Sequence, residues 1–371
     1  MKKVIFLIAA IYIFFQLINI ISHYLIFDRT SYELLYNIPV FPRGAIFPWL
    51  NFDGKNYLNI VLNGYPFGDI LSVYFPLYPL LVRIFSLNLI FNPIYMGFII
   101  SITSTLIASI VLFNLVKIEF NDKIAIRSTF LLFIFPASYY FFAYYSEGLF
   151  LLLTVLVFWF IRKKNILIAS IITSFATATR PFGLALIPTL LYEGYKIYHK
   201  KKKIPWEIAI APLGFILYAI FTYLKFGDMF LMITAQSNAR FGRSIDILSP
   251  YHEFRDVILK IISGPQSSYD NIFVYPVIII EFLFGVYTLL ILYLVFKKLP
   301  PHYSIYTLSS VILIFFGSSF SSIIRYLLPI FPAYIILSLL LSKKQLIFLS
   351  IVSLLLLVFA SSLFLRNYWI S

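Results

Sequence analysis

Long apolar runs separated by shorter polar connections make up most of this 371-residue chain. A helix of about 20 apolar residues crosses the hydrocarbon core of a bilayer. The first run follows Met-Lys-Lys and is too long for the core of a signal peptide, so we expect a retained membrane anchor. In all, the pattern predicts about eleven membrane-spanning helices, near residues 4–27, 93–116, 125–143, 146–161, 165–180, 182–197, 206–226, 273–296, 303–318, 325–341 and 346–364.

Two long connections interrupt these runs, at about 28–92 and 227–272, and both have room for short helices. Segment 77–91 in the first connection is apolar enough to be counted as a twelfth span. Its Pro flanks, modest length and central Arg83 argue against a span, and a twelfth span would reverse the orientation of every later loop. We therefore predict a surface-lying or re-entrant helix with apolar residues at 77, 80, 81, 84 and 85. The chain is predicted to be a single all-α domain, 1–371.

Short basic clusters determine the expected orientation, because short cytoplasmic loops carry an excess of Lys and Arg. With the N-terminus inside, alternation of the eleven spans places every short cluster on the cytoplasmic side. These clusters are Lys2 and Lys3; Lys117, Lys123 and Arg127; Arg162 to Lys164; Lys196 and Lys200 to Lys203; Lys297 and Lys298; and Lys343 and Lys344. The two long connections are then extracytoplasmic.

The composition agrees with a polytopic membrane protein. Hydrophobic residues make up 61% of the chain and charged residues only 12%, whereas soluble domains carry about 25% charged residues. The net charge of +14 is concentrated in the short loops, which argues against nucleic-acid binding. The chain has no cysteine, and its four histidines show no ligand spacing, so we expect neither disulfides nor a zinc site. The 41 Phe and 28 Tyr are expected at membrane interfaces and in packing.

In this topology, ionisable residues from distant parts of the sequence gather on the outer side of the membrane. Charges at membrane depth are costly and usually functional. The ionisable residues on the outer side are Asp53 and Asp69 in the first long connection, Glu147 and Arg180 at two outer turns, Arg240 and Arg243 in the second long connection, and Arg325 at the start of the tenth span.

Each of these residues also has a purely structural interpretation. Aspartate is a favourable N-cap, so Asp53 can simply cap the short helix predicted from FDGKNYLNIV. Asp69 can be a turn residue, and Glu147 and Arg180 can form a structural ion pair. Arg240 and Arg243 can be solvated loop charges, and the Arg325 side chain can snorkel to the headgroup region. Glu281, inside the eighth span, has no assigned role and can pair with an arginine or face a polar cavity.

Carboxylates and arginines at one membrane face suit the transfer of a sugar from a lipid phosphate to a hydroxyl. A carboxylate within about 3 Å of the attacking hydroxyl can act as general base, and arginines stabilise the charge on the leaving phosphate. The chain contains neither GxxxxGK[ST] nor GxGxxG, so no nucleotide loop is expected. The first long connection has no DxD, which favours a metal-independent reaction, although a divalent metal bridging two carboxylates and a phosphate stays possible.

Four blocks of this sequence resemble a known family. FDGKNYLNIVLNGY followed by YFPLYPLLVR resembles W-D-G-x-H-Y-L-x-I-A-x-x-G-Y…F-F-P-L-Y-P-L-L-x-R, a pattern of the PIG-V type (GPI mannosyltransferase 2-like) mannosyltransferases of the GT-C superfamily. FPASYYFFAYYSEGLF resembles F-P-x-S-x-F-x-x-x-x-Y-S-E-S-L-F, ATATRPFGLAL resembles A-x-x-x-R-x-x-G-L, and SSIIRYLLPIFPAY resembles S-x-x-R-Y-x-x-x-x-F-P. The blocks occur in family order, from about 49 to 334.

The resemblance implies a multi-span GT-C fold and an inverting transfer of mannose from a polyprenyl- or dolichyl-phosphate donor to a lipid-linked or membrane-presented glycan. By motif position, Asp53 is the catalytic base and Glu147 the second acidic catalytic residue. Arg180, Arg325, Tyr326 and Arg83 are assigned to the donor phosphate or sugar, and Asn56, Tyr57 and Trp49 to the acceptor side. No metal ligand and no cofactor is implied.

The departures from the quoted patterns include Phe52 in place of Trp, Asn56 in place of His, and Gly148 in place of Ser. Trp49, three residues before Phe52, can partly substitute for the missing Trp. The compact chain resembles prokaryotic-looking relatives, so a prokaryotic cell membrane is expected rather than the endoplasmic reticulum. The acceptor, the hexose, the linkage and the oligomeric state are left open by the sequence.

Two other functions compete with a glycosyltransferase. A transporter or lipid flippase would explain polar residues among many spans, and such proteins often show inverted repeats and broken helices at mid-membrane. Here the ionisable residues lie at one face, and no repeat is visible. A non-catalytic subunit of a glycosylation complex is also compatible with the sequence.

Overall fold

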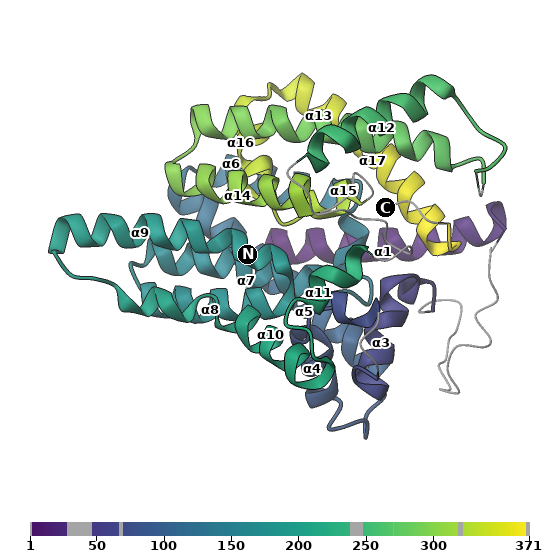
Figure 1. Ribbon diagram of the computed structural model, residues 1–371. Coiled ribbons are helices and arrows are strands. Elements are labelled where there is room, and N and C mark those ends of the chain that lie inside the picture. Colours follow the sequence, from purple (N-terminus) through teal and green to yellow (C-terminus); the bar gives the residue numbers. More distant parts are fainter. Residues whose placement is uncertain are drawn as a thin grey trace.

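The computed structural model describes residues 2–27, 47–66, 70–237, 248–269, 271–317 and 322–368, and all regular structure within them is helical (Figure 1). The first half contains α1 (Lys2–Leu25), η1 (Phe47–Leu50), α3 (Asp53–Asn63), η2 (Ile70–Val73), α4 (Leu77–Phe85), α5 (Pro93–Glu119), α6 (Asp122–Ile134), η3 (Ser138–Phe141), α7 (Glu147–Arg162) and α8 (Ile166–Thr179). The second half contains η4 (Pro181–Ala185), α9 (Leu186–Lys201), η5 (Trp206–Ile210), α10 (Leu213–Phe226), α11 (Leu231–Thr234), η6 (Ala235–Ser237), α12 (Ser249–Ser263), α13 (Val274–Lys298), α14 (Pro301–Gly317), α15 (Ile323–Leu327), α16 (Pro332–Leu340) and α17 (Lys343–Leu365).

Several helices are long and apolar enough to cross a membrane. In the described part of the chain there are five, Val4–Leu25, Pro93–Glu119, Trp206–Phe226, Val274–Lys298 and Lys343–Leu365, and two shorter apolar helices accompany them, Ile166–Thr179 and Pro301–Phe316. The chain is therefore an all-helical, multi-pass membrane protein. The count of eleven spans, the direction in which the chain crosses the membrane and its division into domains stay predictions.

The helix is interrupted in predicted spans 125–143 and 325–341. In predicted span 125–143, α6 ends at Ile134 and Phe135 is extended (ψ 139°), because a following proline disfavours the helical conformation. In predicted span 325–341, α15 ends at Leu327 and α16 begins only at Pro332. Proline lacks the N–H that a helix interior needs, so Pro329 and Pro332 interrupt the segment. The second break leaves Arg325 on a separate short helix.

The structure confirms that segment 77–91 contains a short helix rather than a span. Its nine-residue helix α4 is about 14 Å long at 1.5 Å per residue, far less than the hydrocarbon thickness of about 30 Å. Leu80, Ile84 and Phe85, from the predicted apolar face, are exposed, while Tyr78 and Val82 are buried against the protein.

Helices α5 and α7 approach each other closely at Gly148. A Cβ atom there would lie 2.3 Å from the Thr105 hydroxyl and 2.7 Å from the Ser101 carbonyl oxygen, both on α5. This contact explains why Gly148 replaces the Ser of the quoted pattern. It also brings the first residue of α7, Glu147, against the centre of the helical bundle.

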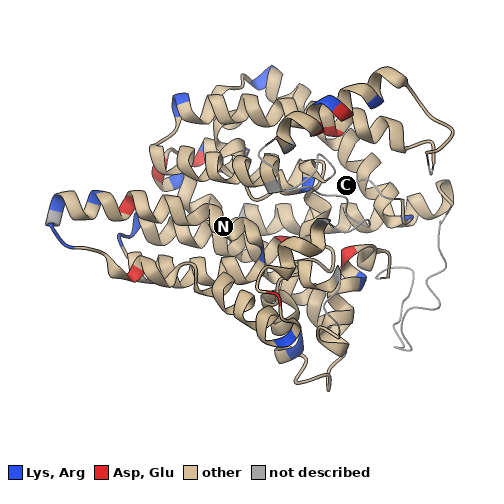
Figure 2. Cartoon of the chain, in the orientation of Figure 1, with Lys and Arg blue, Asp and Glu red and all other residues tan. Residues whose placement is uncertain are grey.

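Figure 2 marks charged residues at few positions along the chain. Lys and Arg gather at the tip of α9, at the left of the view, whereas the C-terminal end of α1 and helix α12 lie at the right. Helices α3, α4, α10 and α11 lie together at the lower right of the bundle (Figure 1). These four helices come from the two long connections and the residues beside them, and three of them, α3, α10 and α11, contribute residues to the cavity described below.

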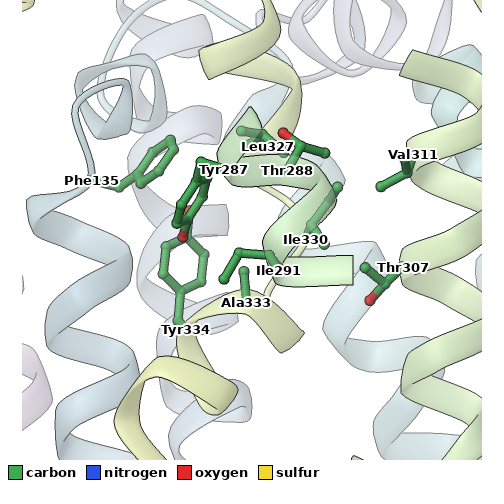
Figure 3. Close-up of a pocket in the computed structure, with 10 residues that line it drawn as sticks. All are labelled: Phe135, Tyr287, Thr288, Ile291, Thr307, Val311, Leu327, Ile330, Ala333 and Tyr334. Carbon is green, nitrogen blue, oxygen red and sulfur yellow. The ribbon is translucent and has the colours of Figure 1, made fainter. Parts of the chain in front are cut away.

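A small cavity lies between α13, α14 and the α15–α16 region (Figure 3). Its volume of about 10 Å³ is close to the lower limit for one water molecule. None of its ten lining residues is charged. We regard it as a packing gap and not as a functional site.

Candidate functional site

Asp53 is the first residue of α3 and not its N-cap. The N-cap is Phe52, which has a left-handed φ of 58° and makes no side-chain capping bond. The Asp53 backbone N–H donates to the Tyr145 hydroxyl at 3.1 Å, and that hydroxyl donates to the Asn51 carbonyl at 2.6 Å. The capping interpretation of Asp53 is therefore wrong, because neighbouring groups engage this helix end and leave the carboxylate free for other contacts.

The Asp53 carboxylate receives two hydrogen bonds from distant parts of the chain. The Tyr74 hydroxyl donates to Oδ1 at 2.8 Å. Nη1 of Arg325 donates to Oδ2 and forms an ion pair with it. The side chain keeps 16% of its surface exposed, and a carboxylate can accept about four hydrogen bonds. Asp53 therefore retains capacity to accept a proton from a further hydroxyl.

Glu147 joins two arginines and completes a charged cluster of four residues, Asp53, Glu147, Arg180 and Arg325. Its Oε1 accepts from Nε of Arg325 and from Nη1 of Arg180. Only 2% of the Glu147 side chain and 6% of the Arg325 side chain is exposed. Two positive and two negative charges balance, which is what permits their burial. The predicted Glu147–Arg180 ion pair is confirmed, whereas the snorkelling interpretation of Arg325 is wrong.

Local sequence explains where both arginines stand. Arg180 ends α8 in an extended conformation (φ −156°, ψ 149°) because Pro181 follows it. Arg325 sits on the five-residue helix α15, which the prolines discussed above separate from α16. Its guanidinium carbon lies 4.8 Å from the ring centres of both Tyr140 and Tyr145. Such cation–π contacts hold the guanidinium in a fixed position.

The start of α15 is held by Glu281, the acidic residue of α13 to which the sequence assigned no role. Ser322 precedes α15 in a left-handed conformation (φ 72°). Its backbone N–H donates to Oε1 of Glu281 at 2.9 Å. Glu281 is only 7% exposed. It thus anchors the short helix that presents Arg325.

We predict that Glu281→Gln retains activity while Glu281→Leu loses about tenfold. Gln keeps an oxygen acceptor for the Ser322 N–H, whereas Leu leaves that buried donor unpaired at a cost of about 1–3 kcal/mol. Initial transfer rates of the two purified variants, with thermal unfolding measured in parallel, test this prediction. Equal rates for the two variants would contradict it.

The charged cluster borders a cavity of about 350 Å³, here called the main cavity. Asp53, Arg180 and Arg325 are its charged lining residues. Most of the remaining wall is apolar and comes from η2, η4, α10, α11 and α14. It includes Val73, Phe75, Phe182, Leu184, Phe215, Met232, Ile233, Ile312, Leu313 and Phe316. The main cavity therefore offers charge and hydrogen bonds at one place and an apolar surface elsewhere, as an amphipathic ligand requires.

Two other residues assigned from the sequence also line the main cavity. Tyr326 stacks on Phe182 with ring centres 4.8 Å apart, and the Arg180 guanidinium carbon lies 6.0 Å from the centre of its ring. Tyr57 shares a hydrogen bond of 2.9 Å with the Ser146 hydroxyl beside Glu147. Tyr326 thus lies beside Arg180, and Tyr57 lies beside Ser146.

Three assigned residues do not line the main cavity. Arg83 donates to the Val61 carbonyl at 3.0 Å and to Asn88 at 2.9 Å, so it closes the end of α3 instead of joining the other arginines. Trp49 is buried, with its ring 5.9 Å from that of Phe15. We therefore withdraw the donor role of Arg83 and the acceptor role of Trp49.

The third residue, Asn56, lies one helical turn after Asp53. Its side-chain amide donates to the Tyr74 hydroxyl at 2.8 Å. Sequence reasoning missed Tyr74, Tyr140 and Tyr145, because the chain has so many tyrosines that composition gives no reason to select these. Their spacing relative to the charged residues becomes visible only in three dimensions. Asp69, Arg240 and Arg243 lie outside the described residues.

The charged neighbours determine the protonation state of Asp53. Burial alone would raise its pKa, but the Arg325 guanidinium and the Tyr74 hydroxyl outweigh burial and lower the pKa below its ordinary value. Asp53 is thus ionised at neutral pH. Burial, followed by the Asp53 charge, raises the pKa of Tyr74 well above its usual value, so that this phenol stays neutral and donates. Burial likewise raises the pKa of Tyr57 to about 12.

Comparison with known proteins agrees with the resemblance seen in the motifs. Residues 42–207 match the model of a family described as Mannosyltransferase (PIG-V). These residues make up a little under half of the chain, and they resemble the PIG-V mannosyltransferases. The matched range includes Asp53, Glu147 and Arg180 but not Arg325, so the family model does not cover the residue that joins the two carboxylates.

Solved structures of an archaeal oligosaccharyltransferase from Archaeoglobus fulgidus resemble the chain at low identity. The form tethered with an acceptor peptide has 13% identity and a TM-score of 0.43, covering 97% of this chain and 55% of that one. The complex with Zn and sulfate has 14% identity and a TM-score of 0.44, with 97% and 53% covered. The complex with an inhibitory peptide and a dolichol-phosphate has 12% identity and a TM-score of 0.43, with 98% and 56% covered. The chain thus spans about half their length, and the comparison with curated proteins gave no match.

No group of three or more His, Cys, Asp or Glu side chains that could hold a metal gathers in the described ranges. The two carboxylates of the site, Asp53 and Glu147, instead share Arg325. Metal independence stays a prediction from the sequence.

Proposed function

We propose that the main cavity binds a polyprenyl- or dolichyl-phosphate mannose and that the protein transfers its mannose to a hydroxyl of a lipid-linked or membrane-presented glycan. Asp53 is the general base, the configuration at the anomeric carbon inverts, and the fold is of the GT-C type. The N-terminus is cytoplasmic, and the site faces the opposite side of the membrane, that of a prokaryotic cell. One observation carries the proposal: Asp53, Arg180 and Arg325 together line an otherwise largely apolar cavity.

The two kinds of cavity wall suit the two parts of such a donor. Arginine binds phosphate oxygens well because its planar fork can donate two parallel hydrogen bonds. Arg180 has 11% and Arg325 6% of the side chain exposed, so both are desolvated enough for strong interaction. The apolar residues of α10, α11 and α14 offer a surface to the first isoprene units of the lipid.

The reaction is a single displacement at the anomeric carbon. The acceptor hydroxyl forms the new C–O bond as its proton passes to a free lone pair of Asp53. The bond between the anomeric carbon and the phosphate oxygen breaks, and the electron pair leaves with the phosphate. Arg180 and Arg325 stabilise the charge that develops there. Glu147, bonded to both arginines, holds them in place and is better described as a positioning residue than as an acid or base.

Transfer by the purified protein tests this proposal. We expect radiolabel from polyprenyl-phosphate mannose to enter the host's glycolipid or membrane glycan fraction, at an unchanged rate in EDTA. Matched donors carrying glucose or another hexose show whether mannose is preferred. Movement of unmodified lipid across proteoliposomes without transfer would support a flippase instead. Transfer only in the presence of a second protein would support a subunit role.

A further inference from the structure

Three polar side chains in the first long connection form a continuous hydrogen-bond chain that ends on Asp53. The Asn56 amide donates to the Tyr74 hydroxyl at 2.8 Å, and that hydroxyl donates to Oδ1 of Asp53 at 2.8 Å. Tyr74 is 6% exposed. Its ring lies edge-on to that of Tyr57, with centres 5.1 Å apart. The Tyr74 hydroxyl carries one proton. Because the Asn56 amide donates to this hydroxyl, the Tyr74 proton is free to be donated to Asp53.

We propose that Tyr74 is a positioning residue for the base: it fixes the carboxylate plane of Asp53 so that an unshared lone pair faces the main cavity. The proposal rests on the proposed function, since it takes Asp53 as the proton acceptor. Arg325 alone cannot fix this plane, because its Nη1 contacts only Oδ2. A second donor on Oδ1, approaching from the side of η2, removes the remaining rotation about the Cβ–Cγ bond.

The two donors in this chain stand at positions where the quoted family pattern has other residues. In W-D-G-x-H-Y-L, His occupies the position of Asn56, and in F-F-P-L-Y-P, Phe occupies the position of Tyr74. Asp53 and Asn56 are three residues apart on α3 and so lie on one helix face. A His at 56 opposite Phe at 74 would therefore place a ring N–H near Asp53. Here, Asn is shorter, and the Tyr74 hydroxyl bridges the remaining distance.

Burial raises the pKa of Asp53, and three groups in the described part of the chain oppose this effect, while the negative charge of Glu147 lies on the other side of Arg325. Arg325 comes from α15, Arg180 from the end of α8 and Tyr74 from the segment after η2, and the pKa of Asp53 is lowered by each of them. Removing the Tyr74 donor takes away one of these influences while both arginines remain. The pKa of Asp53 must then rise, and its base form must be lost at a higher pH than before.

Tyr74→Phe tests the proposal. We expect kcat to fall about 10- to 100-fold, as for a hydrogen bond to a charged group, with the KM for donor nearly unchanged. The acid limb of the kcat/KM profile should move to higher pH. The matched control is Tyr78→Phe, which removes a buried hydroxyl four residues away that lies 3.1 Å from the Gly97 carbonyl and 3.0 Å from the Ser101 hydroxyl on α5.

Rescue of the Tyr74→Phe variant by a second substitution distinguishes a role in positioning Asp53 from a role in folding. The double variant Asn56→His with Tyr74→Phe should regain part of kcat and return the acid limb toward its original pH. Asn56→Ala, at a partly exposed position, should shift both readouts in the direction of Tyr74→Phe but less far. A Tyr74→Phe variant with the kcat and acid limb of Tyr78→Phe would overturn this role and leave the proposed function intact. Full activity in Asp53→Asn would overturn both.

Discussion

Replacing Asp53 by Asn should lower the transfer rate by about 10²–10⁴-fold, the usual contribution of a general base. Asn keeps the size of the side chain and an oxygen for the Tyr74 hydroxyl, which donates at 2.8 Å in the native protein. It cannot take a proton from the acceptor hydroxyl. The variant should insert into the membrane and bind donor, so that the loss appears in kcat measured at saturating donor.

Asp256→Asn is the matched control for this variant. Asp256 lies on α12 in the second long connection, with its side chain 51% exposed and paired only with the adjacent Arg255 among the ion pairs of the described residues. The same change of one carboxylate to an amide should leave transfer unaffected there. Wild-type turnover by Asp53→Asn would remove the base role, whatever the control shows.

Replacing Arg325 by Met should abolish transfer and also destabilise the protein by about 3–5 kcal/mol, the usual cost of breaking a buried ion pair. Arg325 contacts both Asp53 and Glu147. Its loss leaves two buried carboxylates with Arg180 as the single remaining cation of the charged cluster. Unfolding of the detergent-solubilised protein, followed by heat or denaturant, measures the stability, and transfer is assayed on the same preparation.

A second substitution separates these two effects. Glu147→Gln in the Arg325→Met background leaves one buried carboxylate, Asp53, with one arginine, Arg180. The charges of the cluster balance again, so much of the lost stability should return while transfer stays absent. Arg255→Met, at a position that is 48% exposed, should change stability by less than about 0.5 kcal/mol. If the double variant regains transfer, Arg325 has only a structural role and the donor phosphate is bound elsewhere.

Sequence patterns predicted the charged side chains of the site but not how each is used. Asp53, Glu147, Arg180 and Arg325 were selected because membrane topology puts them on one side. That selection holds because burying a charge among apolar helices is expensive, so each charge needs a partner. Arg83 shows the limit of motif position: it stands in the quoted pattern, yet it contacts the carbonyl end of α3. A pattern records the residue type and not the direction of its side chain.

Apolar periodicity and charge, by themselves, indicated that this chain is a helical membrane protein, where its long apolar helices fall, and which carboxylates and arginines can meet. The tertiary structure alone decided that Asp53 is no helix cap, that Arg325 lies between two carboxylates, and that Tyr74 and Glu281 orient the site. The physical reason is the range of the interactions. Helix formation and membrane insertion depend on neighbouring residues, whereas the ion pair of Asp53 and Arg325 joins residues 272 positions apart and exists only once the helices have packed.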